Sequence, residues 1–398
     1  MKTKIEQAKI ITISSKTLDQ ADILFDETGI LEIGTVTGHA DQVIDGRGKT
    51  VLPGFIDCHT HPSELCSTDE LSVAYKNYHG VMKLLESGIT TTRITGTKYN
   101  ADVALRDMIN RGELEGPRIL ACGEPICITC GHCAEIGMEC DSVPETLKAA
   151  RTLCKHHVDW LKMMPTSGVL GVGPSTEVQL SKEQIEAIIQ VGHAFATPTC
   201  AHLMNYDALR LCVESGLTCV EHGYDMDHEI AQEMVKRGTW YIPTAVVTLM
   251  EMTFIKNNDE LVLKAAAAQE KVRRAVRTAI EAGVRMAVGT DTGCPYTGPD
   301  TCAFATELYI YQVSGMDPLE VLSCATLRGA QLLGIEQQTG SLEVGKQADL
   351  VLIDGDPLSD ICDTKYVTHT FRNGRLLYQN PWAREKYADF RIDDYVLS

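Results

Sequence analysis

Two histidines separated by one residue follow an apolar run near the start of the chain. The run covers residues 51–56, and His59 and His61 come shortly after it. Side chains two residues apart point to the same side of a β-strand. We therefore expect both imidazoles to project together from the carboxyl end of a buried strand, where they could bind one metal ion. The alternative is a pair of solvated loop histidines.

Four further polar residues lie in or directly after apolar, strand-like runs. Lys162 lies among bulky apolar residues, where a free ammonium would be costly to bury. His202, His222 and Asp291 each end such a run. Each of them has an ordinary explanation on its own, because a strand-end His is more often a hydrogen-bonded structural residue and an Asp after a strand is commonly a helix cap. All of them together with the histidine pair are difficult to explain separately, so they predict one metal site.

The elements that must position these residues alternate between strands and helices in the middle of the chain. Eight strands alternating with helices over about 280 residues predict a parallel, TIM-type (β/α)8 barrel, whose chemistry lies at the carboxyl ends of the strands. The predicted strands cover residues 55–58, 90–94, 118–122, 158–163, 197–201, 218–221, 239–243 and 285–289.

Helix boundaries in this region are marked by capping signals. Ser142 followed by Glu145, and Ser181 followed by Gln184, fit the capping box, in which the hydroxyl and the acid or amide satisfy free N–H groups. Glycine commonly ends a helix because it adopts the left-handed conformation without strain. Helices are expected to end near Gly88, Gly112, Gly216, Gly238, Gly283 and Gly334.

Both ends of the chain predict short β-strands instead of helices. Asn373-Gly374 between two apolar runs is a strong hairpin signal. We expect the two ends to pair into one small β-sandwich domain beside the barrel. The predicted domains are residues 1–52 with 336–398 for the β-sandwich, and residues 53–335 for the barrel.

Composition and charge restrict the partners of the chain. The 398 residues are 44% hydrophobic and carry a net charge of −18, which argues against a nucleic-acid partner and gives no support to an anionic membrane surface. The sequence contains no apolar stretch of about 18 residues, and its first residues lack a secretory signal. The fifteen cysteines are typical of reduced cytosolic thiols. We expect a soluble cytoplasmic homo-oligomer that acts on a small-molecule or dipeptide-like substrate.

The full pattern resembles the binuclear metal-dependent amidohydrolases. It comprises His-x-His, a strand Lys, two strand-end His and a final Asp, and the resemblance covers nearly the whole chain. Residues 340–350 are similar to the return of the chain into the small β-domain of that superfamily. The most similar branch is that of the prolidase-like dipeptidases and carboxypeptidases, on the evidence of residues 161–163 with Ser167, Gly168 and Gly171, and of residues 221–223.

The resemblance implies a specific metal chemistry. Lys162 would be carboxylated by CO2, which turns a buried cation into an anionic carbamate that bridges two divalent ions, expected to be Zn2+. The ions would share a bridging hydroxide, lower its pKa and polarise the scissile carbonyl. Asp291 would take the proton of the hydroxide and pass it to the leaving amine. The implied ligands are His59, His61 and Asp291 for one ion and His202 and His222 for the other, with Lys162 as the bridge.

Several other residues are candidates for contacts with the substrate. By similarity to prolidase-like enzymes, His132 and Tyr224 would contact the carbonyl or carboxylate of the substrate; the alternative is a hydrogen-bonded loop His and a packed Tyr. We interpret Arg93 as an ion-pair residue of the barrel interior. Asp300 and Glu307 are candidates for an ammonium clamp.

The predicted function is a metal-dependent hydrolase that cleaves an amide bond of a small peptide-like substrate, of the Xaa-Pro dipeptidase or carboxypeptidase type. The same centre could hydrolyse a cyclic amide, lactone, carbamate or phosphotriester, since the ligand set does not determine the leaving group. Imidazolonepropionase-like ring opening is a weaker alternative, because those enzymes use one metal and lack the bridging Lys. Residues 293–301 depart from the His-Gly pattern common in relatives, which leaves substrate choice open. A non-catalytic metal-binding protein is disfavoured by the intact ligand set.

Three cysteines at regular spacing form a separate motif. Cys127, Cys130 and Cys133 could ligate an iron–sulfur cluster or a structural zinc ion. They lie in one loop and lack an obvious fourth ligand, so we favour incidental or redox-sensitive thiols.

Overall fold

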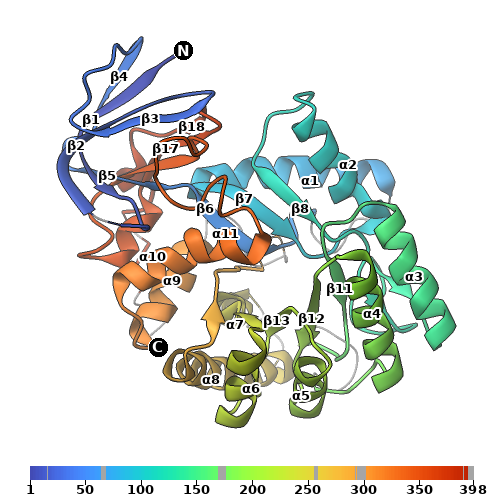
Figure 1. Ribbon diagram of the computed structural model, residues 1–398. Helices are drawn as coiled ribbons and strands as arrows, with labels where there is room; N and C mark the ends of the chain where they lie inside the picture. Colours follow the sequence, from blue (N-terminus) through green and yellow to red (C-terminus); the bar gives the residue numbers. More distant parts are fainter. Residues whose placement is uncertain are drawn as a thin grey trace.

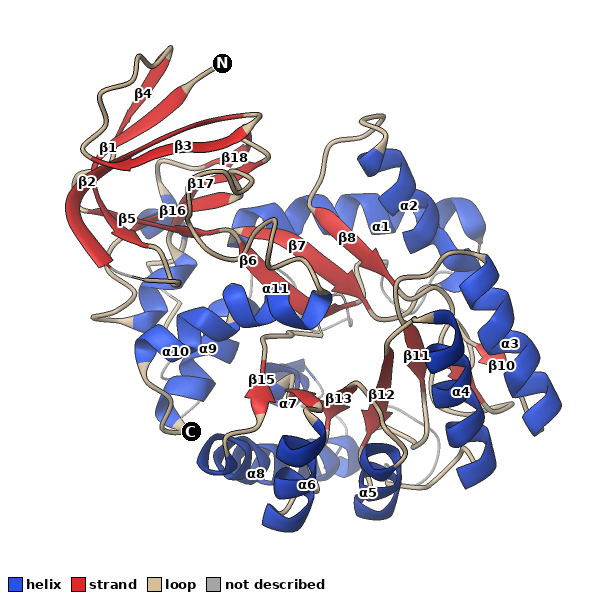
Figure 2. Cartoon of the chain, viewed as in Figure 1, coloured by secondary structure: helices blue, strands red, loops and turns tan. Residues whose placement is uncertain are grey.

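The strands of the protein form three sheets, which are seen in a computed structural model (Figures 1 and 2). The sheets contain eight, seven and three strands. The structure describes residues 1–15, 17–63, 69–168, 176–254, 259–291, 293, 302–388 and 390–392.

The eight-stranded sheet is built from both ends of the chain. Its strand order is β18-β17-β16-β5-β1-β2-β3, and β4 pairs with β1. The two ends meet where β5 pairs antiparallel with β16, and Figure 1 shows the first strands beside the last ones. The strands are β1 (Thr3–Ile11), β2 (Thr17–Asp26), β3 (Gly29–Gly34), β4 (Gln42–Asp45), β5 (Lys49–Pro53), β16 (Leu350–Asp354), β17 (Val367–Arg372) and β18 (Arg375–Gln379).

The predicted hairpin near the end of the chain is confirmed. β17 pairs antiparallel with β18, with Arg372 opposite Arg375. Asn373 and Gly374 connect them, both with positive φ (49° and 72°). Two positive φ values in a two-residue loop match the twist of the flanking strands, which explains why Asn-Gly occupies this position.

All eight strands predicted for the middle of the chain are present and parallel. Three form the sheet β6-β7-β8, and five belong to the sheet β10-β9-β11-β12-β13-β14-β15. The short β9 and β10 were not predicted, because two-residue strands leave no periodic pattern. The strands are β6 (Phe55–Thr60), β7 (Ile89–Ile94), β8 (Arg118–Ala121), β9 (Ile126–Cys127), β10 (Met138–Glu139), β11 (Leu161–Met163), β12 (Thr199–Leu203), β13 (Cys219–His222), β14 (Trp240–Ile242) and β15 (Arg285–Met286).

Helices follow the parallel strands and lie on their outer side, as α3 to α6 do in Figure 2. This alternation gives a TIM-barrel-type fold. The helices are α1 (Glu70–Leu84), η1 (Leu85–Ser87), η2 (Lys98–Asn100), α2 (Ala101–Asn110), α3 (Val143–Lys155), α4 (Lys182–Phe195), α5 (Tyr206–Glu214), α6 (His228–Arg237), α7 (Ala245–Phe254), α8 (Asp259–Ala282), α9 (Ala303–Val313), α10 (Pro318–Cys324), α11 (Leu327–Leu333), η4 (Ile361–Lys365) and α12 (Ala383–Lys386).

One of the two predicted capping boxes is present. At the start of α4, the Ser181 hydroxyl accepts from the Gln184 N–H and the Gln184 side chain accepts from the Ser181 N–H. The prediction at α3 is wrong in detail, since Ser142 caps the helix without a side-chain bond to its backbone. Its hydroxyl donates to Glu145 instead, at 2.9 Å. The Ser142 side chain therefore binds the Glu145 carboxylate and not a backbone N–H group of the first turn.

Backbone hydrogen bonds connect the two parallel sheets on both sides. The Cys58 N–H donates to the Val288 carbonyl at 2.8 Å, which ties β6 to the segment after β15. The Asp159 N–H donates to the Ala121 carbonyl at 2.7 Å, which ties β8 to the segment before β11. Both parallel sheets therefore act as one support for the residues at their carboxyl ends.

Four cysteines in or next to the parallel strands point into the protein interior. Cys58, Cys122, Cys200 and Cys219 are fully buried and pack in one apolar cluster with Trp160. The cysteines that the structure describes are all free, as expected for thiols that act as small apolar side chains. Among the described residues, none of the helices combines the length and the apolar character that crossing a membrane requires.

Candidate metal centre

The structure brings together the five histidines predicted for the site and Asp291. The rings form a continuous arc, with centroid separations of 5.3, 5.1, 4.5 and 4.2 Å between successive members. The order along the arc is His61, His59, His222, His202 and His132.

The arc begins with a group that can hold a metal ion. Ligand atoms of His59, His61 and Asp291 all lie within 4.8 Å of one another. The two histidines are buried, and the Asp291 side chain is 13% exposed. The Asp291 Oδ1 atom lies 3.5 Å from Nε2 of His59 and 3.3 Å from Nε2 of His61. Asp291 has a positive φ of 56°, and its N–H donates to the His59 carbonyl at 2.8 Å. Such strained backbone conformations concentrate at functional sites.

Hydrogen bonds fix the tautomers of the first two histidines. His59 Nδ1 lies 2.6 Å from the Glu221 carboxylate, and His61 Nδ1 lies 3.1 Å from the Gly96 carbonyl. Both acceptors lack a proton to give, so each Nδ1 carries the hydrogen and each Nε2 keeps its lone pair. The Thr95 hydroxyl lies 3.1 Å from Nε2 of His61. Both Nε2 atoms thus have the form that a metal ion requires.

The other two histidines are held in the same manner. His202 Nε2 lies 3.0 Å from the Ser167 carbonyl, so it donates and Nδ1 keeps the lone pair. His222 Nδ1 lies 2.6 Å from the Thr244 hydroxyl, which itself donates to the Pro243 carbonyl at 2.7 Å. Because that hydroxyl proton is already used, His222 Nδ1 donates and Nε2 keeps its lone pair. Each of the four histidines therefore keeps the lone pair on one ring nitrogen, and for His61 the Thr95 hydroxyl lies 3.1 Å from that nitrogen.

Lys162 lies in the middle of β11 and is 1% exposed. Burial lowers the pKa of each histidine in the arc, and the Lys162 charge acts in the same direction on all of them. For His132 the pKa is lowered to about 4. The imidazoles are therefore neutral at pH 7, as ligands must be. Burial raises the pKa of Asp291, while His61 and Lys162 oppose this rise.

The two candidate substrate residues also lie at this site. His132 ends the arc of rings, 4.2 Å from His202. The Tyr224 ring lies 5.8 Å from that of His222, and its hydroxyl donates to the Thr244 carbonyl at 3.5 Å. Their position agrees with a substrate contact, although the role itself stays a prediction.

The other predicted residues have different outcomes. Arg93 is confirmed as a buried ion-pair residue, 2.6 Å from Glu221. The interpretation of Glu307 as a clamp is wrong, because its buried oxygens accept from the N–H groups of Ala245 and Val246 at 3.1 and 2.7 Å. Both oxygens therefore accept hydrogen bonds from the backbone at the start of α7. Asp300 and Gly171 lie outside the described residues, as does the segment 293–301 except for Gly293.

The cysteine motif does not form a metal site within the part of the chain that the structure describes. The three-ligand group at His59 is the one cluster of that kind there. Cys127 is buried in β9, whereas Cys130 is exposed and Cys133 is intermediate. The interpretation of these residues as incidental or redox-sensitive thiols stays a prediction.

Sequence reasoning missed the residues that hold the ligands. Glu221 holds His59 and Thr244 holds His222. Asp57 accepts from the Thr290 hydroxyl at 2.6 Å and so ties β6 to the residue before Asp291. Burial raises the pKa of Asp57 to about 7. The sequence did contain a signal for Asp57 and Glu221, since each is an acid within an apolar strand and lies one or two residues before a predicted ligand.

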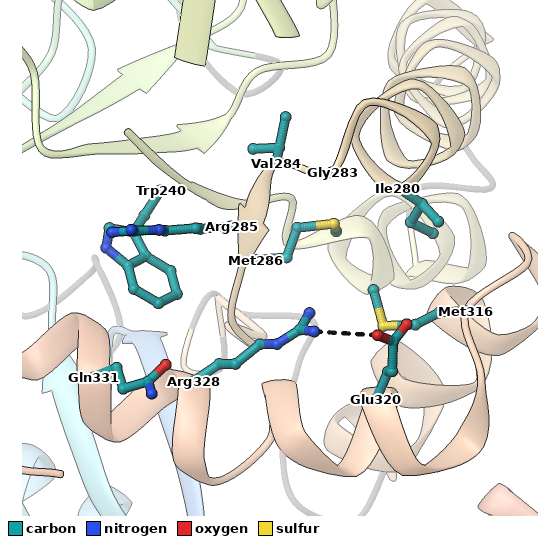
Figure 3. Close-up of a pocket in the computed structure, with 10 residues that line it drawn as sticks. All are labelled: Trp240, Ile280, Gly283, Val284, Arg285, Met286, Met316, Glu320, Arg328 and Gln331. Carbon is teal, nitrogen blue, oxygen red and sulfur yellow. Dashed lines mark hydrogen bonds and ion pairs between the residues drawn. The ribbon is translucent and has the colours of Figure 1, made fainter. Parts of the chain in front are cut away.

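A pocket lies at the opposite, amino ends of the strands (Figure 3). It has a volume of about 540 Å3 and is bordered by the first residues of β14 and β15. The Arg285 guanidinium lies over the Trp240 ring, 5.8 Å from its centroid. Arg328 approaches Glu320 at 3.4 Å. None of the predicted site residues lines this pocket.

Comparison with known proteins identifies the family. The model of the amidohydrolase family matches residues 50–377. The chain belongs to the amidohydrolase family. Because it belongs to this family, the protein is an enzyme that acts on C–N bonds, an amide hydrolase. Members of the family are generally metal-dependent.

Individual relatives of this amidohydrolase are distant in sequence but similar over most of their length. It is 26% identical to ochratoxinase of Aspergillus niger over 393 residues, covering 86% of this chain and 79% of the relative. It is 26% identical to imidazolonepropionase of Legionella pneumophila, covering 77% and 79%. A crystal structure of an Xaa-Pro dipeptidase with bound methionine in the active site has a TM-score of 0.86 and 29% identity, covering 96% and 100%. The predicted resemblance to prolidase-like amidohydrolases is confirmed.

Proposed function

We propose that this amidohydrolase uses two metal ions to cleave an amide bond in a small peptide-like substrate, of the Xaa-Pro dipeptidase or carboxypeptidase type. One observation carries the proposal: four buried histidines each have one ring nitrogen bonded to a fixed acceptor and keep the lone pair on the other, around Lys162 and Asp291. Four oriented imidazoles exceed what one catalytic zinc ion needs, since such an ion keeps an open position. The similarity to an Xaa-Pro dipeptidase supports the substrate class.

The ligands would divide between two positions. His59, His61 and Asp291 would hold one ion, because their atoms lie within 4.8 Å of one another. His202 and His222 would hold the other, with ring centroids 4.5 Å apart. Imidazole and carboxylate ligands favour Zn2+.

Lys162 would bridge the two positions as a carbamate. The ε-amine would add to the carbon of CO2 and release one proton, which leaves an anion with two oxygens. A buried cation among neutral imidazoles would repel metal ions, and the carbamate removes this repulsion. The burial of Lys162 and its charge effect on all five histidines support this position for the bridge.

The protein side chains would then divide the work of hydrolysis. Bound metal ions would lower the pKa of a shared water and polarise the scissile carbonyl. Asp291 would accept the proton of the attacking water and deliver it to the leaving amine. His132 and Tyr224 would orient the carbonyl or carboxylate of the substrate.

We also propose the fine architecture that supports this site. The two parallel sheets would close into one (β/α)8 barrel of residues 53–335, a closure that the hydrogen bonds of Cys58 and Asp159 support. Residues 1–52 and 336–398 would form a separate β-sandwich domain, which the separate apolar core of the eight-stranded sheet supports. Assembly into a homo-oligomer stays a prediction.

Turnover with defined metal content tests the function. Protein stripped of metal and reloaded with zero, one or two equivalents of Zn2+ would be assayed with Xaa-Pro dipeptides, matched Xaa-Ala dipeptides and N-acyl amino acids. We expect hydrolysis of at least one amide class that rises steeply with the second equivalent. Absence of hydrolysis across the panel with two ions bound would contradict the peptidase proposal.

Cyclic amide hydrolysis is the second candidate, and the similarity to imidazolonepropionase favours it. It makes a different prediction for metal content, since ring opening of that type is expected with one ion and without a bridging Lys. Full activity on a cyclic amide with one equivalent of Zn2+ would favour this candidate over the first.

A further inference from the structure

A chain of three buried polar side chains runs beneath the proposed metal centre. Arg93 in β7 donates from its guanidinium to Glu221 Oε1 in β13 at 2.6 Å. The second oxygen of Glu221, Oε2, accepts from His59 Nδ1 at 2.6 Å. All three side chains are at most 1% exposed. The chain therefore connects β7 and β13, which belong to different parallel sheets, with a proposed ligand.

Arg93 is itself held firmly. Its Nε donates to the Cys58 carbonyl at 2.6 Å, and its guanidinium lies 4.5 Å from the centroid of the Trp160 ring. Its Nη1 is buried and has no hydrogen-bond partner among the described residues. A buried guanidinium with an unsatisfied nitrogen is costly.

Stability alone does not account for this arrangement. Replacing a buried ion pair by apolar side chains of similar volume is often neutral or stabilising. The cysteines and Trp160 around Arg93 already provide an apolar environment for such side chains. The pair is therefore better explained by what Glu221 does for His59.

The backbone at Glu221 and His222 adds a second link. Consecutive side chains of a regular strand point to opposite faces, yet Glu221 contacts His59 and the His222 ring lies 5.1 Å from the His59 ring. His222 has a positive φ of 65°, which departs from strand geometry and turns its side chain toward the same site. The Tyr241 hydroxyl holds this conformation by donating to the His222 carbonyl at 2.8 Å. One dipeptide thus serves both proposed metal positions.

We propose that Glu221 and Arg93 are positioning residues for the metal centre: Arg93 holds Glu221, and Glu221 holds His59 with the hydrogen on Nδ1 and the lone pair of Nε2 toward the metal. This inference rests on the proposed two-metal function. Partners of this kind typically change metal affinity about 10- to 100-fold. The effect should fall on the ion bound by His59, because among the described residues the Glu221 carboxylate bonds to His59 and Arg93 and not to the His202 or His222 side chain.

Two double variants separate positioning from structural support. Arg93→Met with Glu221→Gln, and Arg93→Met with Glu221→Leu, both remove the buried charges. Only the Gln variant keeps an acceptor for His59 Nδ1–H. Chelator competition with Zn2+ would give both dissociation constants, and thermal unfolding of the metal-free proteins would give their stabilities.

We expect the Leu variant to bind one of its two ions about 10- to 100-fold more weakly than the wild type. The Gln variant should stay within a few-fold of the wild type for both ions. Equal affinities in the two double variants would overturn the inference, as would an equal loss at both positions.

Controls distinguish the positioning role from a general loss of stability and from failure of the proposed two-metal function. Arg118→Gln breaks another ion pair away from the site, 3.0 Å from Asp349, in which Asp349 is fully buried and Arg118 is 11% exposed. This variant should lower stability without changing either dissociation constant. A wild-type protein that binds fewer than two ions would contradict the proposed function itself. Two ions in the wild type, with unchanged affinities in the Leu variant, would contradict only the positioning role.

Discussion

A polar pair at the carboxyl ends of the parallel strands and a polar pair at their amino ends differ in how far they are exposed to water. At the carboxyl ends, His59 and Glu221 are at most 1% exposed and 2.6 Å apart. At the amino ends, the side chains of Arg328 and Glu320 are 30% and 57% exposed and 3.4 Å apart, in the pocket of Figure 3. Both pairs join residues from different elements, but of the two only the pair at the carboxyl ends is removed from water.

This difference determines which end can do chemistry. Exposed ion pairs contribute about 0.2–1 kcal/mol and leave long side chains mobile. Buried polar groups must be paired, so each partner restricts the orientation of the next. At the carboxyl ends this restriction fixes four tautomers and keeps the imidazoles neutral. The exposed pair of Arg328 and Glu320 lacks both effects.

The largest effect is expected from Lys162→Ala at the carboxyl end. Removing the proposed bridge should reduce the metal content below two ions per chain and lower kcat/KM by more than about 100-fold, since a bridging ligand should matter at least as much as the groups that only orient ligands. Elemental analysis with steady-state kinetics measures both. Full occupancy by two ions in this variant would exclude Lys162 as the bridge.

Asp291→Asn should remove the proposed proton acceptor. We expect kcat to fall about 100- to 10,000-fold, the usual contribution of general acid–base catalysis, even with Zn2+ in excess. Unfolding by urea would check that the variant remains folded. A variant with kcat within threefold of the wild type would assign the proton transfer to another group.

A buried acid outside the metal ligands gives a prediction for pH. Burial raises the pKa of Glu307 to about 8, so the folded protein keeps a proton that the unfolded chain releases near its ordinary pKa. Stability from this group is therefore full at low pH and is lost as pH rises toward 8. Relative to Glu307→Gln, the free energy of unfolding of the wild type should fall by up to about 1.4 kcal/mol per pH unit.

Urea unfolding of metal-free wild type and Glu307→Gln between pH 5 and 8 measures this difference. Subtracting the two curves cancels the contribution of the buried histidines, which acts in the opposite direction. A difference that stays constant with pH would show that Glu307 is ionised in the folded protein.

The smallest effect is expected at the amino end. Glu320→Gln removes the exposed pair with Arg328 and should change the free energy of unfolding by less than about 1 kcal/mol. Metal content and kcat/KM should stay at the wild-type values. A tenfold fall in kcat/KM would show that the two ends of the strands are coupled, and the comparison above would then fail.

The sequence by itself determined the main elements and the candidate ligands. Apolar runs located all eight predicted strands, because a strand that is buried on both faces must be apolar. Four of these runs are followed by His59, His202, His222 or Asp291, which identified the carboxyl ends of the strands as the candidate site. The hairpin at Asn373 and the capping box at Ser181 were also predictable, since they depend on residues within four positions of one another.

Only the tertiary structure decided how the ligands are held. Glu221 lies 162 residues from His59, and Arg93 lies 128 residues from Glu221. Local patterns carry no information about such pairs, and for that reason Glu307 was misinterpreted as a clamp. The sequence determined which side chains could bind a metal. Folding determined their tautomers, because a tautomer depends on the partner that the other ring nitrogen meets.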